Sequence, residues 1–186
     1  MPISQADLRI TSATDEIANT LPAFFGDVFT AAEGADEGAA IAALVGAMIA
    51  LPTDAGLRAF TAQHDRTLVG AVLFSPLHFA DGAQDTMLLS PMAVATAHQG
   101  QGIGQALITH ALARLAGAGV QHAVTYGDPA FYGRVGFSAV STDDLAAPYP
   151  LSHPQGWIAQ SLTGAPLPRR IGPVRCVAPL ADPAFW

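Results

Sequence analysis

A glycine-rich loop is the segment of this sequence best suited to binding a ligand. Its residues, Gln99-Gly-Gln-Gly-Ile-Gly-Gln105, stand between an apolar strand-like run and a long amphipathic helix pattern. A helix N-terminus exposes unpaired N–H groups with a partial positive charge, and glycines let the main chain approach a ligand without a Cβ clash. Together these features predict a phosphate-binding site. All 8 basic residues are Arg and the chain has no Lys, so backbone amides would have to hold the phosphate.

The spacing within this loop excludes two common phosphate-binding motifs. A Walker A loop needs Lys after its last Gly, where this chain has Gln105. The dinucleotide fingerprint needs Gly or Ala as its third small residue, and Gln105 and Leu107 occupy the two places where it could fall. The pattern that remains is Gln-x-x-Gly-x-Gly, filled by Gln99, Gly102 and Gly104. The non-functional interpretation is that these glycines only start the helix.

A second segment, rich in aromatic residues and glycine, follows the next predicted strand. It reads Gly127-Asp-Pro-Ala-Phe-Tyr-Gly-Arg-Val-Gly-Phe137. In order and spacing, the two segments resemble the GNAT acetyltransferases, whose loop reads Arg/Gln-x-x-Gly-x-Gly/Ala and whose later segment reads Phe/Tyr-Tyr-x-x-x-Gly-Phe. The second segment is similar to the YhbS-like branch of that family. The resemblance is close over residues 88–140 and extends more loosely back to Leu8.

The resemblance implies acetyl-CoA as the co-substrate and assigns a role to several residues. Tyr132 would be the general acid that protonates the departing CoA thiolate; its alternative is a packing residue with an exposed hydroxyl. The main chain at the end of the strand before the loop would pair with the pantetheine arm, and the loop amides would hold the pyrophosphate. The implied cofactor contacts are Met92, Ala93 and Val94 for pantetheine, and Gln99, Gly100, Gln101, Gly102, Ile103, Gly104 and Gln105 for pyrophosphate.

Two positions depart from the family pattern. The family often places a carboxylate on the strand before the loop, but residues 86–95 contain none. Thr125 stands where the family has an Asn seven residues before the tyrosine, which puts one CoA contact in doubt. The general base is therefore unassigned, with four candidates by rough position: His78, Asp85, Glu33 and Glu37.

The function implied is acetyl transfer to an amine of a small molecule or peptide, by direct attack in a ternary complex. The alternative is a non-catalytic module that binds or senses acyl-CoA, which the missing strand carboxylate would favour. The net charge of −7 disfavours a nucleic-acid partner, since such binding neutralises phosphates. The 6 His and single Cys show no spacing typical of a metal site.

The periodicity of apolar residues predicts an α/β fold, with a mixed twisted sheet of six or seven strands flanked by helices. Pro22 lies inside the first helix pattern and indicates a kink or a later start. The predicted helices span residues 15–30, 39–51, 102–116 and 129–134. The predicted strands span residues 8–11, 57–64, 67–74, 86–95, 120–125, 137–140 and 157–162, with an interruption at Ser90-Pro91.

The chain of 186 residues is predicted to hold one domain, residues 1–162, and a Pro-rich extension, residues 163–186. The extension would pack on the domain or form the interface of a homodimer. The most apolar run, residues 39–52, is shorter than the roughly 20 residues of a membrane-spanning helix. The N-terminal residues lack a basic segment followed by an apolar one, and Cys176 has no partner for an internal disulfide. These features predict a cytoplasmic protein with no membrane partner.

Overall fold

The computed structural model describes residues 7–186, so the first six residues of the predicted domain lie outside the described part. The chain forms two compact units. One comprises the described residues up to Leu73 together with Pro91–Ala111, and the other comprises Phe74–Ser90 and Leu112–Trp186. Three elements contribute residues to both units: β3 (Thr67–Pro76), β5 (Thr86–Val94) and α4 (Ile103–Gly117).

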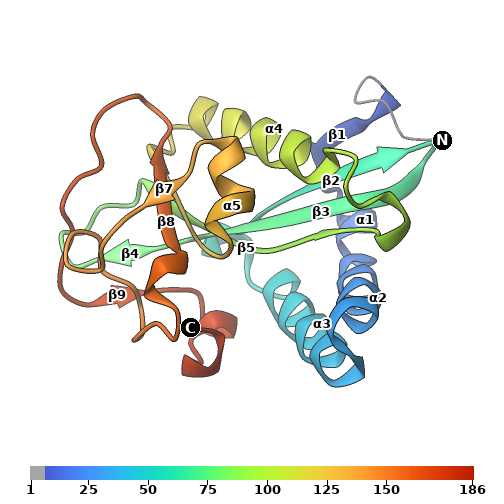
Figure 1. Cartoon of the computed structure of the whole chain (residues 1–186), viewed down its shortest axis with the longest axis horizontal. Helices are drawn as coiled ribbons and strands as arrows, with labels where there is room; N and C mark the ends of the chain where they lie inside the picture. The colour runs from blue at the N-terminus through green and yellow to red at the C-terminus, as the bar shows by residue number, and fades with distance from the viewer. Residues whose placement is uncertain (1–6) are drawn as a thin grey trace. The chain divides into compact units, whose positions relative to one another are not determined.

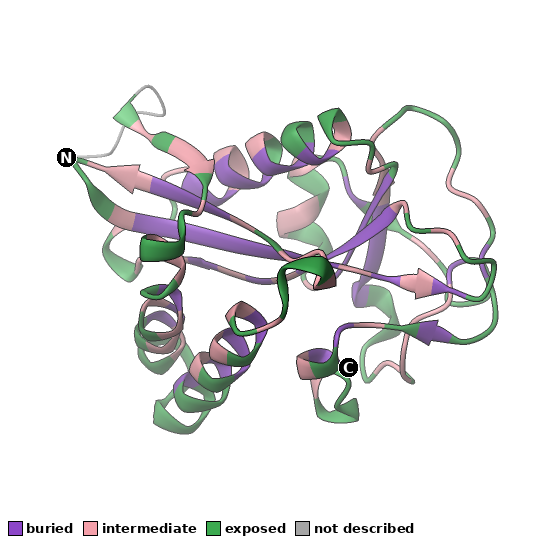
Figure 2. Ribbon diagram, turned by 180° about the vertical axis from the view of Figure 1, so that it is seen from behind, coloured by how far each residue is buried: buried purple, intermediate pink, exposed green. Residues whose placement is uncertain are grey.

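The first unit joins a helical hairpin to antiparallel strands (Figure 1). Strands β1 (Arg9–Ser12) and β2 (Arg58–His64) pair antiparallel. Strand β3 is buried along almost its whole length (Figure 2). The helices of this unit are α1 (Asp15–Ala18), α2 (Leu21–Glu33), α3 (Ala35–Ile49) and the first part of α4.

The helical hairpin departs from its predicted bounds in two places. The single helix predicted over residues 15–30 is split, and α2 begins at Leu21 with Pro22 in its first turn. Proline suits that position because its fixed φ is helical and its missing N–H would have no partner there. Helix α3 begins at Ala35 instead of residue 39. Gly34, with φ of 106°, supplies its N-cap, and the two acidic residues that follow favour a helix N-terminus.

Helix α4 approaches β3 closely because Gly70 lacks a side chain. A Cβ at Gly70 would lie 3.4 Å from Ile103 Cγ2 and 3.4 Å from Leu107 Cδ2. Both of these side chains are buried. In the first unit, α4 covers one face of the strands while α2 and α3 cover the other (Figure 1). Among the described residues, no helix is both long and apolar enough to cross a membrane.

The second unit is built around the parallel pair formed by β5 and β6 (His122–Tyr126), whose register runs from Thr86↔His122 to Leu89↔Thr125. β8 (Trp157–Ser161) pairs antiparallel with β6 and carries β7 (Ser138–Ala139) on its other edge. α5 (Pro129–Tyr132) follows β6. Two further strands, β4 (His78–Phe79) and β9 (Val174–Arg175), pair antiparallel and are not among the strands that the sequence predicts.

The strands of the larger sheet are hydrogen-bonded in the order β1-β2-β3-β5-β6-β8-β7. The predicted α/β fold, a mixed sheet of six or seven strands flanked by helices, is therefore confirmed. The predicted interruption at Ser90-Pro91 is wrong, because β5 runs continuously from Thr86 to Val94.

The end of the C-terminal segment packs within the second unit. The Trp186 ring lies 6.1 Å from that of Trp157 in a T-shaped arrangement, and Trp186 is 5% exposed. Its Nε1 donates to the Leu180 carbonyl at 3.0 Å, and its own carbonyl accepts from Ser152 Oγ at 2.7 Å. The boundary between residues 162 and 163 remains a prediction.

Candidate functional site

The glycine loop of the first unit adopts a conformation that its glycines make accessible. Gly100 and Gly102 have φ of +73° and +78°. Residues that carry a Cβ disfavour these angles. Helix α4 begins at once at Ile103, so the loop turns directly into the N–H groups of its first turn. Gly100 is exposed and Gly102 is half-buried. This geometry suits an anion held by main-chain amides.

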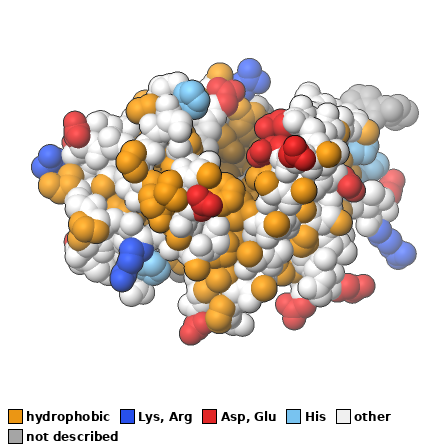
Figure 3. All heavy atoms as spheres, turned by 90° about the horizontal axis from the view of Figure 1, so that it is seen from below, with side chains coloured by type: hydrophobic (Ala, Val, Ile, Leu, Met, Phe, Trp, Pro, Cys, Tyr) orange, Lys and Arg blue, Asp and Glu red, His pale blue; other side chains and the backbone are white. Residues whose placement is uncertain are grey.

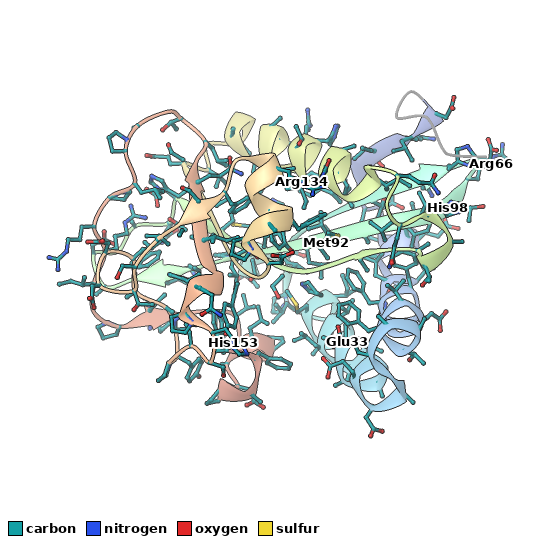
Figure 4. The ribbon with its side chains drawn as sticks, viewed as in Figure 1. Glu33, Arg66, Met92, His98, Arg134 and His153 are labelled. Carbon is teal, nitrogen blue, oxygen red and sulfur yellow. The ribbon has the colours of Figure 1, made fainter. Side chains whose placement is uncertain are left out.

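The loop is tied to the end of β5. Gln99 Nε2 donates to the Val94 carbonyl at 3.1 Å. The β5–β6 register ends at Leu89, while β5 itself continues to Val94. Met92 and Val94 are half-buried and Ala93 is buried; Met92 is labelled on β5 in Figure 4. All ten predicted cofactor contacts therefore lie on one segment of the first unit, running from the end of β5 into α4.

Tyr132 lies in the second unit at the end of α5. Asp128 caps that helix by accepting from the Ala130 N–H at 2.9 Å. The Tyr132 ring makes T-shaped contacts with Phe131 and Phe137, with centroids 5.0 and 5.7 Å away. It also lies against Gly127, where a Cβ would come within 2.6 Å of Tyr132 Cε2. The ring is therefore held on several sides by its neighbours.

The Tyr132 hydroxyl has a raised pKa. Burial raises the pKa of Tyr132 to about 12, although a hydrogen bond with the Thr125 side chain lowers it in part and Asp128 raises it further. At neutral pH the phenol is therefore protonated, as a proton donor must be. Tyr132 is thus a residue that the sequence predicts, whereas the influence of Thr125 on its pKa appears only in the structure.

Asp85, one of the candidate bases, is engaged by Arg170. Arg170 Nη1 donates to Asp85 Oδ1 at 2.6 Å, and Nη2 donates to Oδ2 at 2.8 Å. These bonds lower the pKa of Asp85 to about 2 against the opposing effect of burial. A carboxylate that weakly basic is a poor general base near neutral pH. Candidates Glu33 and Glu37 are exposed and His78 is half-buried; Figure 4 shows Glu33 at the end of α2.

The surroundings of this ion pair form what we call the Arg170 cluster: Asp81, Asp85, Thr86, His122 and Arg170. Arg170 Nη1 also donates to Thr86 Oγ1 at 2.8 Å, and its Nε lies 3.1 Å from Asp81 Oδ2. His122 Nδ1 lies 3.6 Å from Asp85 Oδ1, and burial is the main cause that lowers the pKa of His122. The cluster fastens the segment around residue 170 to the start of β5 and β6.

Within residues 7–186, no three His, Cys, Asp or Glu side chains are grouped so that they could hold a metal ion. Cys176 is a free, half-buried cysteine. Arg134 follows α5 and His98 precedes α4 (Figure 4). Neither of these two side chains is among the ten predicted cofactor contacts.

Known proteins are similar to this chain in sequence and in fold. The sequence matches the Acetyltransferase (GNAT) family over residues 26–137. It is 35% identical over 124 residues to the uncharacterized N-acetyltransferase YjhQ of Escherichia coli (strain K12), covering 63% of this chain and 67% of that protein. It is 34% identical over 83 residues to the uncharacterized N-acetyltransferase YhbS of the same strain, covering 45% of this chain and 50% of YhbS.

Solved structures of acetyltransferases have the same fold as this chain. A GNAT family acetyltransferase from Brucella melitensis, in complex with acetyl-CoA, superimposes with a TM-score of 0.69 at 26% identity, over 93% of this chain and 97% of that one. Escherichia coli YhbS, in complex with CoA, has the same fold with a TM-score of 0.74 at 23% identity, over 95% and 93% of the two chains. This chain belongs to the GNAT acetyltransferase family. The predicted resemblance, including its YhbS-like branch, and the prediction of an N-acetyltransferase are confirmed.

Proposed function

We propose that this protein transfers the acetyl group of acetyl-CoA to an amine of a small molecule or peptide. The observation that carries the proposal is the loop of positive-φ glycines that leads directly into the N-terminus of α4. Membership of the acetyltransferase family supports it, as do the solved relatives bound to acetyl-CoA or CoA.

Two sets of residues in the first unit suit the pyrophosphate and the pantetheine arm of acetyl-CoA. The amides of Gln99–Gln105 hold the pyrophosphate, because several N–H groups at a helix N-terminus can bind the same anion. The main chain of Met92–Val94 pairs with the pantetheine arm like an added strand, since β5 extends beyond its register with β6. No Lys contributes, because the chain has none.

Acetyl-CoA supplies a thioester whose C–S bond breaks as the amine nitrogen forms its C–N bond. In this proposal Tyr132 directs its hydroxyl proton to the departing sulfur. A free thiol has a pKa near 8.5, whereas that of Tyr132 is raised to about 12. Complete proton transfer to the sulfur would therefore cost about 5 kcal/mol. Tyr132 accordingly acts first as a hydrogen-bond donor that stabilises negative charge on the sulfur, and gives up its proton only as the amine releases its own.

The acceptor in this proposal is an amine of low pKa. An α-amine near pKa 8 is already about a tenth neutral at pH 7, while a Lys-like amine is neutral in only roughly one molecule in a few thousand. Such an acceptor makes little demand on a base, in keeping with Asp85 being engaged by Arg170. The net charge of −7 and the acidic side chains among hydrophobic ones in Figure 3 favour a cationic acceptor. A homodimer formed through residues 163–186 and a cytoplasmic location stay predictions.

The test is turnover of acetyl-CoA with a panel of primary amines, followed by release of the CoA thiol. Cys176 sets a background of one thiol per chain. We expect thiol release with at least one amine, and Tyr132→Phe should lower kcat about 10²-fold without changing the Kd for acetyl-CoA. Tyr149→Phe is the matched control, since Tyr149 lies against Trp186, and it should retain the wild-type rate. Acetyl-CoA binding with no turnover of any amine would contradict the proposal and favour the sensing module.

A further inference from the structure

We propose that Ser90 binds the amine that accepts the acetyl group, through a hydrogen bond from an amine N–H to Ser90 Oγ, and that this contact selects primary amines. The inference rests on the proposed function, because it needs acetyl-CoA to lie along β5. It assigns a substrate contact to a stretch, residues 86–95, that contains no carboxylate.

Ser90 stands at the point where β5 loses its parallel partner. The last pair of the β5–β6 register is Leu89↔Thr125, so Ser90 is the first residue of β5 beyond it. Strand β6 stays paired with β8 up to Tyr126, whereas residues 90–94 of β5 have no partner in the β5–β6 register. The edge of β5 that pairs with β6 is therefore unused from Ser90 onward.

The Ser90 hydroxyl is the polar side-chain group of β5 that a ligand can reach. Ser90 is half-buried, and its Oγ makes no hydrogen bond within the part of the chain that the structure describes. Thr86, the other hydroxyl of β5, is engaged, because its Oγ1 donates to Asp85 Oδ1 and accepts from Arg170 Nη1. On β3, Ser75 Oγ also has no partner among residues 7–186, but Ser75 is 0% exposed.

The order of contacts along the chain places the thioester beside Ser90. In the proposed function, the amides of Gln99–Gln105 hold the pyrophosphate and the main chain of Met92–Val94 pairs with the pantetheine arm. The arm therefore runs from the loop back along β5, and its thioester end lies beyond Met92. Ser90 is two residues further, about 7 Å along a strand. Burial alternates along β5 from Ser90 onward, so its side chain lies on the same face as that of Met92.

The contact strengthens as the acetyl group is transferred. A neutral primary amine has a lone pair for the thioester carbon and two N–H groups. As its C–N bond forms, the nitrogen gains positive charge and both N–H groups become stronger donors. Ser90 Oγ accepts one of them, while the other proton leaves to water. The C–S bond breaks, the sulfur takes the proton of Tyr132, and the proton released to water replaces it, so that atoms and charge balance.

This chemistry separates primary amines from other acceptors. A secondary amine has one N–H and an alcohol has one O–H, so neither can keep a hydrogen bond to Ser90 while it releases its proton. A primary amine can do both. The substrate class that fits Ser90 is therefore a primary amine.

The first experiment locates the thioester without an amine. Bromoacetyl-CoA carries an electrophilic carbon in place of the acetyl methyl group, and in Ser90→Cys the thiolate displaces bromide to form a C–S bond, which mass spectrometry detects. We expect labelling at least about tenfold faster than in Ser138→Cys, and excess CoA should block it. Ser138 is the matched control because it is exposed on β7. The wild type gives the background from Cys176.

Calorimetric titration of CoA gives the outcomes of this experiment separate meanings. If Ser90→Cys binds CoA with the wild-type Kd but is labelled no faster than Ser138→Cys, or is not protected by CoA, the Ser90 proposal is overturned and the proposed function stands. If the wild type does not bind CoA, the proposed function is overturned with it.

The second experiment tests the selection of amines. The probes are the primary amines of the panel, glycinamide among them, each paired with its N-methyl derivative. We expect Ser90→Ala to lower kcat/KM for the primary amine about tenfold and to change that of the N-methyl derivative little. The KM for acetyl-CoA should stay unchanged, and Ser90→Thr should restore the rate. Ser75→Ala is the matched control, because it removes a free hydroxyl that no substrate can reach.

An equal fall for a primary amine and its N-methyl derivative would indicate a structural effect and overturn the role of Ser90 alone. No turnover of any primary amine by the wild type, although Ser90→Cys is labelled, would overturn the proposed function and with it the contact between Ser90 and an amine.

Discussion

The glycine loop and the Arg170 cluster use polar groups in opposite ways. The loop, Gln99–Gln105, has no charged side chain, and it offers main-chain N–H groups next to exposed glycine. The cluster gathers one guanidinium and two carboxylates, and the Arg170 side chain is only 8% exposed. In one region the polar groups are left accessible for a ligand, and in the other they are bound to one another. The buried charges of this chain therefore bond to one another, whereas the proposed function assigns anion binding to the backbone of an uncharged loop.

The largest effect that tests this contrast comes from removing Arg170. Arg170→Met leaves the Asp85 carboxylate without its bidentate partner, and breaking a buried pair from one side is costly. We expect the free energy of unfolding to fall by about 3 kcal/mol, measured by urea denaturation.

The neighbouring arginine supplies the control. The Arg169 side chain is 66% exposed and lies 3.5 Å from Asp144, itself exposed. Exposed ion pairs contribute about 0–1 kcal/mol, so Arg169→Met should fall within that range. Equal losses for the two variants would mean that burial of the cluster does not matter.

Acid should weaken the same cluster. The pKa of Asp85 is lowered from 3.8 to about 2 in the folded chain. The ionised Asp85 carboxylate therefore contributes about 2 kcal/mol to the free energy of unfolding above pH 4. This contribution is lost as pH falls towards 2. Between pH 5 and pH 3 the wild type should lose about 1 kcal/mol more than the double variant Asp85→Asn, Arg170→Met. Urea unfolding at both pH values measures this, and parallel losses in the two proteins would refute the assignment.

The smallest expected effect is in the loop. Gln99 donates one side-chain hydrogen bond to Val94 and contributes no charge. If main-chain amides bind the pyrophosphate, Gln99→Ala should weaken acetyl-CoA binding only about two- to fivefold. A loss of 10²-fold or more, measured by calorimetry, would show that the side chain and not the backbone carries the affinity.

The loop and α4 could be predicted from the sequence because their signals are local. Gln99, Gly102 and the helix that comes after them are contiguous, and so is the segment around Tyr132. The Arg170 cluster could not be predicted, because Asp85 and Arg170 are 85 positions apart and no periodicity links them. Position alone makes Asp85 a candidate base, and only its contact with Arg170, which lowers its pKa, shows that it is poorly suited to that role.

Short or irregular elements were missed for a related reason. β4 and β9 contain two residues each, too few to show an alternating pattern. The sequence predicts a start for α3 at residue 39 because Gly34–Gly38 has the composition of a turn, whereas the helix begins at Ala35. Gly38 suits that helix because a Cβ there would overlap Thr30 on α2. That packing requirement cannot be seen in the local sequence.

In the proposed function, the backbone of the glycine loop binds acetyl-CoA. Calorimetric titration of acetyl-CoA into the wild type, Gly102→Glu, Gly102→Ala and Gly117→Glu tests it most directly. Gly102→Ala imposes the same positive-φ strain without charge, and Gly117→Glu places the same charge at the other end of α4, where a Cβ meets nothing within 4 Å. We expect micromolar binding by the wild type and by Gly117→Glu, a weaker Kd for Gly102→Ala, and no detectable binding by Gly102→Glu. Wild-type affinity in Gly102→Glu, or no binding by the wild type, would contradict the account.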